Sequence, residues 1–569
     1  MFAHKQLTTV ALRYGPLALA LCIGIVIKNP LDKIYRKTFP QTQPDQIDLL
    51  LKQGIDLQAA GKLKEAISTY KQLLTTNPAI TQTLVRLGSA ASELKDYNSA
   101  ITYYKSAITI APNHLGAYGA LSANLRYTKE YAQAAKYATM GVSLVSDYYD
   151  GYFQLSKAQT ELAEFEQAIK NAQKAITLQP NNIHAYLNLG HIHNRNGTLD
   201  DAVAMYKKAL EITPEFPNAL YNLGYTLRIQ KKTDEALTYL LRAAELQANY
   251  VDAHVAIAQA YWSQKKFDVA WQEYEWRWKL LGIDPHAMST PLWDGCDLKG
   301  KTIVLYCEQG LGDTLQFVRY TKLVKEKGAT VVCKVQKPLL TLLAQFPHID
   351  KLISSMAETK GMHIDYQAPL LNLPGILKTR EHTIPADIPY LKADPKLISL
   401  WKSKLAHDTK FKIGLCWHVD PHHEVDKSPW EKRTVTIDLF TQLSRIANTS
   451  FYSLQKINGE DQLKNLPESF VVKTFDQNFD EKHGRFMDTA AVIMNLDLVI
   501  TVDTSVAHLA AGMGKKVWML LPYTPDPRWY NEGQATPWYP NMRLFRQPKP
   551  YDWQSVGNEL KVALAALVK

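Results

Sequence analysis

Three loops in the C-terminal half of this 569-residue chain combine residues that could bind and transfer an anionic group. The first loop reads EQGLGD, between the β-rich run TIVLYC and a helical pattern. Gly310 and Gly312 allow the backbone to approach a ligand closely, and Asp313 places a carboxylate at the expected start of the helix. An acidic residue there can also cap the helix, so the sequence leaves a structural and a catalytic role open for Asp313.

The second loop is rich in histidine and cations and runs from Trp417 to Arg433. Its three histidines and Asp420 resemble metal ligands, but they lack the ordered helical spacing of a zinc site. We therefore expect no metal here. We expect Lys427 and Arg433 to face an anionic ligand instead.

The third loop lies in the run DLVITVDTSVAHLA, residues 497–510, where a buried strand should end at Asp503. A helix rich in small residues begins within two residues, so the amides of Thr504, Ser505 and Val506 should have no intrahelical acceptor. Such amides attract an anion such as a diphosphate, by about 0.3–2 kcal/mol from the helix dipole. The structural alternative is a Thr/Ser cap beside a partly buried aspartate.

The elements around these loops indicate an α/β region after residue 284. Short β-rich runs alternate with helices, and parallel sheets bind ligands at the carboxyl ends of their strands. The charged, proline-rich segment 378–410 divides the region in two, which predicts two Rossmann-like lobes with a cleft between them. The expected strands are Thr302–Cys307, Thr330–Val335, Lys412–His418, Phe451–Gln455, Leu498–Val502 and Lys516–Leu521.

The N-terminal half repeats itself every 34 residues over 47–284. Glycines recur in one phase, alanines twelve residues after them and large residues four further on, as in Gly88, Ala100 and Tyr104. Small residues let two antiparallel helices approach, and the large residue fills the gap beside them. This pattern resembles the tetratricopeptide repeat, and seven such units predict a solenoid with a concave face.

The repeat array suits a peptide-binding or oligomerisation scaffold. Asn188 and Asn222 share one position of the inner helix and could hold an extended backbone, as the superhelix of O-linked N-acetylglucosamine transferases does. With His422 of the second loop, they are our candidates for acceptor binding.

Composition and charge narrow the classes of function. The chain is 46% apolar and 21% charged, which excludes wholesale disorder. Its net charge of +10 divides as +4 over 1–46, +1 over 47–284 and +5 over 285–569, so no nucleic-acid-binding stripe stands out. Five scattered cysteines suggest neither disulfides nor zinc, and favour a reducing compartment.

Residues 14–27 form an apolar stretch with basic flanks. The stretch is shorter than the roughly 20 residues of a spanning helix, and no small residues mark a cleavage site after it. An uncleaved anchor on the inner face of the cytoplasmic membrane and a segment packed on the first repeat both remain open. In the first case, the heavier basic flank after the stretch keeps the body of the protein in the cytoplasm.

Taken together, the C-terminal motifs resemble glycosyltransferase family 9, the ADP-heptose:lipopolysaccharide heptosyltransferases, in a bacterial form fused to tetratricopeptide repeats. The matching stretches are PLWDG (291–295), EQGLGDTLQF (308–317), DTAA (488–491), DLVITVDTSVAHLA (497–510), LLPY (520–523) and the DPRW and WYP runs beyond them. The resemblance implies a GT-B fold, a nucleotide-diphosphate sugar as donor, inversion at the anomeric carbon, and no metal or other cofactor.

Carried onto this sequence, the resemblance makes Asp313 the general base on the acceptor hydroxyl. It places Thr504, Ser505 and His508 in the donor-phosphate motif, after Asp503, and puts Arg433 and Lys427 against the phosphates, in that order.

The expected organisation has four parts: 1–46, the apolar segment and linker; 47–284, the repeats; and 285–395 and 396–569, the two lobes. The expected activity is inverting sugar transfer to a protein or glycan presented by the solenoid. The alternative is an interaction scaffold with an inactive transferase-like region. The enzyme hypothesis requires Asp313 to face the Thr504 turn across the cleft.

Overall fold

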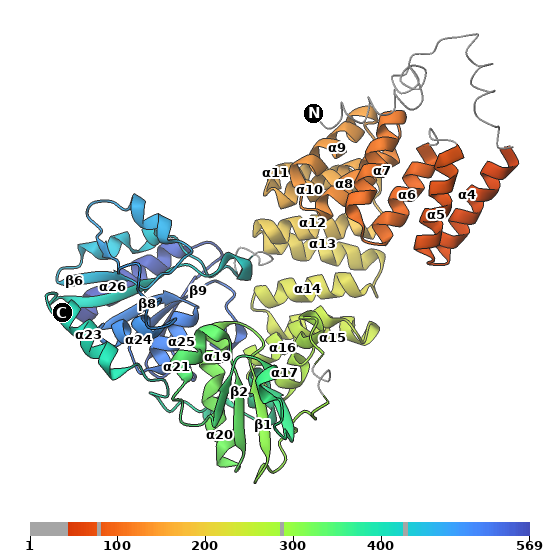
Figure 1. The fold of residues 1–569 in the computed structure, drawn as a ribbon. Coiled ribbons are helices and arrows are strands. Elements are labelled where there is room, and N and C mark those ends of the chain that lie inside the picture. Colours follow the sequence, from red (N-terminus) through yellow and green to blue (C-terminus); the bar gives the residue numbers. More distant parts are fainter. Residues whose placement is uncertain (1–43, 77–80, 285–288, 425–430, 569) are drawn as a thin grey trace, which may run out of the picture. The chain divides into compact units, whose positions relative to one another are not determined.

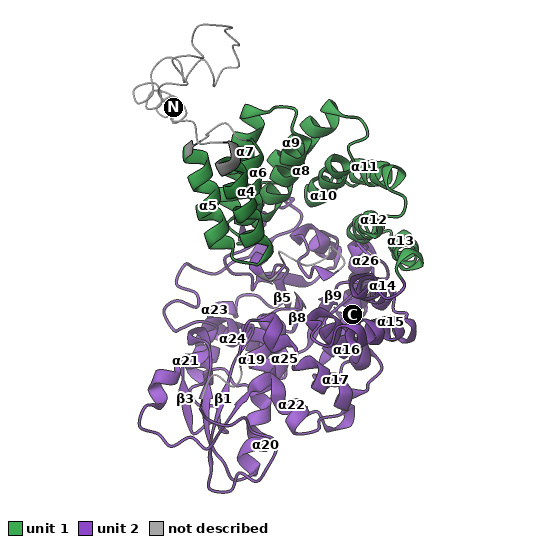
Figure 2. Cartoon of the chain, turned by 90° about the vertical axis from the view of Figure 1, so that its right-hand side faces the viewer, with its two compact units in different colours: residues 1–213 green, residues 214–569 purple. Residues whose placement is uncertain are grey.

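A computed structural model describes residues 44–76, 81–284, 289–424 and 431–568 of the chain (Figure 1). The chain divides into two compact units, Met1–Thr213 and Pro214–Lys569, which we call unit 1 and unit 2 (Figure 2). The predictions for residues 14–27 and for Lys427 lie outside the described residues.

Unit 1 is built from helix pairs that follow the 34-residue period. The second helices of the pairs begin at residues 63, 97, 131, 165 and 199. The helices are α4 (Pro44–Ala59), α5 (Leu63–Thr76), α6 (Thr81–Glu93), α7 (Tyr97–Ile110), α8 (Leu115–Tyr127), α9 (Tyr131–Leu144), α10 (Tyr149–Glu161), α11 (Phe165–Leu178), α12 (Ile183–Asn196) and α13 (Leu199–Ile212).

The small residues have the packing role that the sequence predicted. A β-carbon added to Gly88 would lie 2.7 Å from the ring of Tyr104, and one on Gly190 would lie 2.6 Å from the ring of Tyr206. Where serine replaces glycine, the Ser122 hydroxyl donates to the carbonyl of Ala134 at 2.9 Å. In the pairs that have glycine here, a large side chain of the second helix therefore occupies the space that a β-carbon would need.

Unit 2 begins with two further helix pairs in the same period. These are α14 (Pro217–Ile229), α15 (Thr233–Leu246), α16 (Val251–Ser263) and α17 (Phe267–Tyr274). Helix α17 has 8 residues where the other second helices have 14, and a short helix α18 (Arg277–Leu280) follows it. The last repeat thus ends at α18, whose residues Arg277 and Trp278 contact the α/β region.

Two parallel sheets make up the α/β region. The first has the strand order β3-β2-β1-β4, and the second β10-β9-β8-β5-β6-β7. The strands are β1 (Thr302–Tyr306), β2 (Thr330–Lys334), β3 (Lys351–Ile353), β4 (Tyr366–Pro369), β5 (Phe411–Cys416), β6 (Thr449–Ser453), β7 (Val472–Lys473), β8 (Leu498–Val502), β9 (Val517–Leu521) and β10 (Met542–Arg546). Strand β8 is buried at all five positions, as expected for a central parallel strand.

Helices connect the strands and bring the two sheets' loops together. They are α19 (Leu311–Phe317), α20 (Thr321–Glu326), α21 (Leu340–Leu343), α22 (Leu373–Ile376), α23 (Pro395–Leu405), α24 (Met487–Met494), α25 (Ser505–Gly512) and α26 (Trp553–Val568). Helix α19, which follows the first sheet's β1, packs against α25, which follows the second sheet's β8. The predicted order of helical repeats followed by parallel α/β structure is confirmed.

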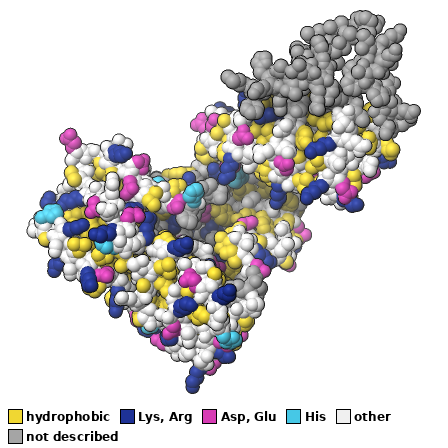
Figure 3. Space-filling model, viewed as in Figure 1, with side chains coloured by type: hydrophobic (Ala, Val, Ile, Leu, Met, Phe, Trp, Pro, Cys, Tyr) yellow, Lys and Arg dark blue, Asp and Glu magenta, His cyan; other side chains and the backbone are white. Residues whose placement is uncertain are grey.

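The described residues contain no helix that is both long and apolar enough to cross a bilayer. On the face that Figure 3 shows, Lys and Arg are interspersed with Asp and Glu. This mixing agrees with the small regional net charges of the sequence.

Candidate functional site

A cavity of about 890 Å³ lies within unit 2, where the repeats and both sheets contribute to its lining. Its walls include Gln259 of α16, Asp313 of α19, Arg433 and the Thr504 turn before α25. All three loops that the sequence singled out therefore line one cavity. For the second loop, this holds for the part that the structure describes.

Asp313 caps the helix that carries it and also faces the cavity. Its Oδ2 accepts the backbone N–H of Gly310 at 3.1 Å, and its Oδ1 lies 2.8 Å from Nη1 of Arg528. The Asp313 side chain is 16% exposed. The helix cap that the sequence offered as the structural alternative is therefore present. In addition, the second carboxylate oxygen of Asp313 pairs with Arg528, which lies more than 200 residues later in the chain.

Gly312 serves the contact between α19 and α25. A β-carbon added there would lie 2.8 Å from Cδ2 of His508 and 3.5 Å from the α-carbon of Ser505. A β-carbon on Gly310 would meet nothing closer than the Asp313 carboxylate at 3.4 Å. The sequence predicted a close approach to a ligand at both glycines, but at Gly312 the space is taken by the other sheet's helix.

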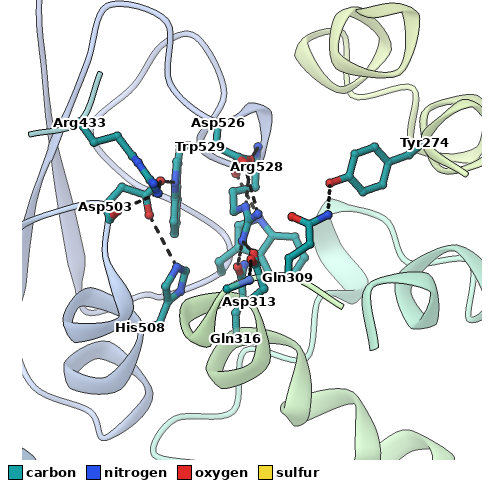
Figure 4. A network of polar contacts seen from close by, with 12 residues as sticks. Tyr274, Gln309, Asp313, Gln316, Arg433, Asp503, His508, Asp526, Arg528 and Trp529 are labelled. Carbon is teal, nitrogen blue, oxygen red and sulfur yellow. Dashed lines mark hydrogen bonds and ion pairs between the residues drawn. The ribbon is translucent and has the colours of Figure 1, made fainter. Parts of the chain in front are cut away.

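Asp503 is the centre of a buried polar network at the end of β8 (Figure 4). The indole of Trp529 donates to its Oδ2 at 3.0 Å, His508 Nε2 lies 3.6 Å from its Oδ1, and Arg433 donates to its backbone carbonyl at 3.0 Å. Burial would raise the pKa of Asp503, but His508, Arg433 and Arg528 outweigh it and hold the pKa well below its usual range. Asp503 is therefore an anion that orients its neighbours.

Arg433 and His508 are fixed by further contacts. Glu424 accepts the backbone N–H groups of Arg433 and Thr434. The buried Nε of Arg433 has no acceptor among the described residues, although its side chain lines the cavity. Arg433 can therefore still donate a hydrogen bond to a ligand.

His508 is held from its other side. The side chain is 3% exposed, and its Nδ1 shares a hydrogen bond of 2.9 Å with the Tyr539 hydroxyl.

Arg528 was not predicted, although it lies in the DPRW run. Its guanidinium donates to both oxygens of Asp526, to Gln316 at 2.6 Å and to Asp313 (Figure 4). Burial lowers the pKa of Arg528, but Asp526, Asp313 and Asp503 outweigh it and raise the pKa well above the usual range. A permanent cation therefore lies between the Asp313 and Asp503 carboxylates.

Glu308, the first residue of the EQGLGD loop, joins that loop to the last repeat. Arg277 and Trp278 of α18 each donate to its carboxylate at 2.8 Å, and Arg277 also donates to Asn372. The side chains of Arg277 and Glu308 are 4% and 1% exposed. The repeat array thus holds the backbone from which Asp313 projects, which no local sequence pattern indicated.

Two further cations line the cavity, Lys456 and Arg485. The Lys456 ammonium donates to the Phe479 carbonyl at 2.6 Å and lies 3.7 Å from Glu481. Arg485 lies 5.7 Å above the ring of Phe486. Neither position carried a sequence signal, because each is an isolated cation in a loop without a recognisable motif.

The DTAA run has a structural role. The Asp480 carboxylate accepts the backbone N–H groups of Asp488 and Thr489 and the Thr489 hydroxyl, which caps α24. Asp488 in turn accepts the Asp480 N–H and the Trp401 indole. Burial raises the pKa of Asp480, the one of these two aspartates that lines the cavity.

The three acceptor candidates lie outside the cavity lining. Asn188, in unit 1, donates from its amide to the Ser156 hydroxyl at 2.8 Å. Asn222 lies on α14, and His422 is exposed in the short helix Pro421–His423. Among the residues described, no three His, Cys, Asp or Glu side chains are grouped to hold a metal ion.

Comparison with known proteins identifies the helical half. Matches to families described as "Tetratricopeptide repeat" cover residues 48–79, 81–114, 149–182 and 217–250, and one described as "TPR repeat" covers 192–228. These segments are tetratricopeptide repeats. Their presence supports interaction with other proteins.

The chain is also similar to Protein FlbA of Caulobacter vibrioides, with 23% identity over 317 residues that cover 52% of each sequence. It spans about half the length of that curated relative. A solved tetratricopeptide repeat protein from Parabacteroides merdae is 13% identical, over 42% of this chain and 94% of that one, with a TM-score of 0.37. MamA from Desulfovibrio magneticus RS-1 is 24% identical, over 30% and 95%, with a TM-score of 0.28.

Proposed function

We propose that unit 2 is a metal-independent glycosyltransferase of the GT-B type, which moves a sugar from a nucleotide diphosphate to a hydroxyl group with inversion. One observation carries the proposal: Asp313, after a strand of the first sheet, and the Thr504 turn, after a strand of the second, line the same cavity. Parallel sheets bind ligands at the carboxyl ends of their strands. The motifs that resemble glycosyltransferase family 9 are the same loops.

The donor diphosphate binds, in this proposal, at the start of α25. The first amides of the helix have no intrahelical acceptor, and Thr504 and Ser505 are partly exposed to the cavity. Arg433 adds a cation with an unused N–H group. Stabilisation of the departing diphosphate by these groups is the largest expected contribution to rate.

The acceptor oxygen attacks the anomeric carbon while the bond from that carbon to the phosphate oxygen breaks. The proton of the hydroxyl passes to the Asp313 carboxylate and then to solvent, and the nucleoside diphosphate leaves with the bonding electrons. Asp313 must first release Oδ1 from Arg528. The donor phosphates, which attract the same guanidinium, favour that release.

The repeats supply the acceptor in this proposal. Val255 and Gln259 of α16 line the cavity, so a protein or glycan held by the repeats of unit 2 can reach the reacting groups. We place the reaction in the cytoplasm, and an anchor at residues 14–27 would hold the chain at the inner face of the membrane.

One observation favours the second hypothesis, an interaction scaffold without transfer activity. Both oxygens of Asp313 are engaged, one as a helix cap and the other with Arg528. These two contacts account for an aspartate at this position without any role in binding or converting a substrate.

A thermal-shift screen against ADP-, UDP- and GDP-sugars distinguishes the two hypotheses. A ligand at 100 times its dissociation constant stabilises the folded protein by about 2.7 kcal/mol. We expect one nucleotide class to raise the melting temperature. The variant Arg433→Met should lose the shift, whereas Lys432→Met, which removes an exposed neighbouring cation, should keep it. No shift with any sugar nucleotide would favour the scaffold, whereas equal shifts in both variants would show that Arg433 does not bind the donor.

A further inference from the structure

A second group of charged side chains lies in unit 1, on the first helices of three successive repeats. Arg126 is on α8, Lys157 on α10, and His191 and Arg195 are on α12. We call these four residues the basic cluster. They lie outside the cavity of unit 2 and have no part in the transfer proposed above.

The repeat period shows which face of the helices carries the cluster. Lys157 and His191 are 34 residues apart, and the same position is filled by Tyr225 and Gln259 in the next two repeats. In unit 2 the Tyr225 hydroxyl donates to Glu431 at 3.0 Å, and Gln259 lines the cavity. This repeat position therefore makes contacts outside its own helix pair.

The cluster has more cations than carboxylates to pair with them. Arg195 Nη1 lies 3.5 Å from Glu161, and Arg126 and Lys157 act on the same carboxylate from a greater distance. The side chains of Arg195 and Glu161 are 31% and 27% exposed, so this pair alone is weak. The buried Nε of Arg126 has no acceptor among the described residues.

The other carboxylate near Lys157 is already engaged. Asp150 accepts the Tyr148 hydroxyl and the Gln154 amide, both at 3.2 Å. The Lys157 ammonium lies 5.1 Å above the ring of Phe153. Glu161 is thus the main carboxylate that compensates the charge of three cations, Arg126, Lys157 and Arg195.

Burial, and after it the repulsion between neighbouring cations, lowers pKa values in the cluster. Burial and the charge of Arg126 lower the pKa of Lys157 to about 8. The protein atoms around His191 and the charge of Arg195 also lower the pKa of that imidazole, although the side chain is exposed to solvent. A bound anion would relieve this repulsion and accept the unused N–H groups.

We propose that the basic cluster binds an acidic segment of polypeptide, whose carboxylates pair with Arg126, Lys157 and Arg195. Packed helices lie about 8–10 Å apart. An extended peptide advances about 3.3 Å per residue, so acidic side chains about three residues apart reach successive helices. Nucleic acid is disfavoured, because 47–284 has a net charge of only +1 and offers no basic stripe along which a phosphate backbone could lie.

Fluorescence anisotropy with the full-length chain tests this assignment. The probes are fluorescein-labelled decaglutamate, decaglutamine and a ten-nucleotide oligothymidylate at low salt. We expect decaglutamate to bind, decaglutamine not to bind, and the oligonucleotide to bind at least about tenfold more weakly. Affinity for decaglutamate should fall as salt is added.

Charge variants locate the binding. Lys157→Glu should weaken decaglutamate binding at least about tenfold, and Glu161→Gln should strengthen it several-fold because the competing carboxylate is removed. Lys174→Glu, the same charge change at an exposed position of α11, should leave binding within about twofold.

Three results would overturn the proposal: no binding of decaglutamate, equal losses in Lys157→Glu and Lys174→Glu, or an oligonucleotide that binds as tightly as decaglutamate. If circular dichroism shows that Lys157→Glu is unfolded, Glu161→Gln decides the question. Unchanged or weaker binding in that variant contradicts the assignment. Because these residues lie outside the cavity, the outcome is independent of the sugar-nucleotide screen.

Discussion

Asp313 combines a structural contact with a proposed chemical one, and a single substitution separates them. Asparagine keeps a carbonyl oxygen that can accept the Gly310 N–H but cannot take a proton at neutral pH. We expect Asp313→Asn to lower the transfer rate by about 10²–10⁴-fold, the usual contribution of a general base. The sugar-nucleotide thermal shift should remain, since donor binding uses other groups. Transfer at the wild-type rate would show that Asp313 is only a cap.

Asp503 predicts how stability depends on pH. The folded-state pKa lies below the unfolded value of about 3.9, so the ionised carboxylate stabilises the fold above that pH and loses its contribution as the pH falls. Asp503→Asn should therefore cost about 2 kcal/mol at pH 7, and less at pH 3. Urea denaturation at both pH values measures the difference.

The exposed Asp297→Asn serves as the control for this experiment. It should change stability by less than about 0.5 kcal/mol at either pH. A cost for Asp503→Asn that stays constant from pH 7 to pH 3 would show that the network does not depend on the charge of Asp503.

Prediction from sequence succeeds at single residues only where the partner is local. The cap by Asp313 and the turn at Thr504 follow from residues within a few positions of each other. The Arg528 contact could not be predicted, because its partners Asp313 and Gln316 lie on α19, after a strand of the other sheet and far away in the chain. The approach of His508 to Gly312 was missed for the same reason.

At the scale of elements, the contact between α19 and α25 brings the proposed base toward the proposed donor site. Gly312→Ala should force the helices apart, because the new β-carbon would lie 2.8 Å from the His508 ring. Overpacking of this kind costs about 1–3 kcal/mol, and we expect the sugar-nucleotide shift to fall with it. Calorimetry with and without nucleotide gives both values.

Gly310→Ala is the matched control, two residues earlier in the same loop. Its β-carbon would meet the Asp313 carboxylate only at 3.4 Å, an ordinary contact distance, and its φ of −69° suits any residue. The expected cost is therefore below about 1 kcal/mol, from the weaker capping preference of alanine. Equal effects of the two substitutions would mean that the helix contact does not limit binding.

The strands show how far periodicity alone predicts the elements. All six expected strands are present with ends shifted by up to two residues, because buried parallel strands are continuous apolar runs. Strands β3 and β7 are three and two residues long, too short to leave a pattern, and β10 has Arg543 and Arg546 among its apolar residues. The break after α17 interrupts a period that had predicted a full second helix there.

At the scale of the whole molecule, the end of the repeat period and the boundary between compact units do not coincide. The period ends at residue 284, whereas the units meet between Thr213 and Pro214. The last two repeats therefore belong to the same compact unit as the sheets. Two ion pairs also join these repeats to the α/β region, Lys265 with Glu381 and Arg380 with Asp268, each at 2.8 Å. Both pairs are exposed and contribute little.

The buried contact between α18 and Glu308 indicates that the α/β region needs the last two repeats for its stability. Two fragments, one with and one without these repeats, test this inference. The fragment 214–569 keeps Arg277 and Trp278, and contains every residue that lines the cavity. We expect it to fold alone and to show the sugar-nucleotide shift of the full chain. The fragment 285–569 lacks Arg277 and Trp278, so Glu308 loses both hydrogen-bond partners and the apolar surface that α16–α18 cover meets water, and this fragment should melt lower.

The substitution Glu308→Gln separates this loss from a general effect of truncation. In 214–569 it breaks the ion pair with Arg277 and leaves that buried guanidinium without its carboxylate, so the melting temperature should fall. In 285–569 the residues that cover Glu308 are gone, so the substitution should change the melting temperature little. This difference between the two backgrounds is the decisive feature, because a fragment that is merely too short would respond alike in both. Equal melting temperatures of the two unsubstituted fragments would contradict the argument, and would return the functional boundary to the end of the repeats.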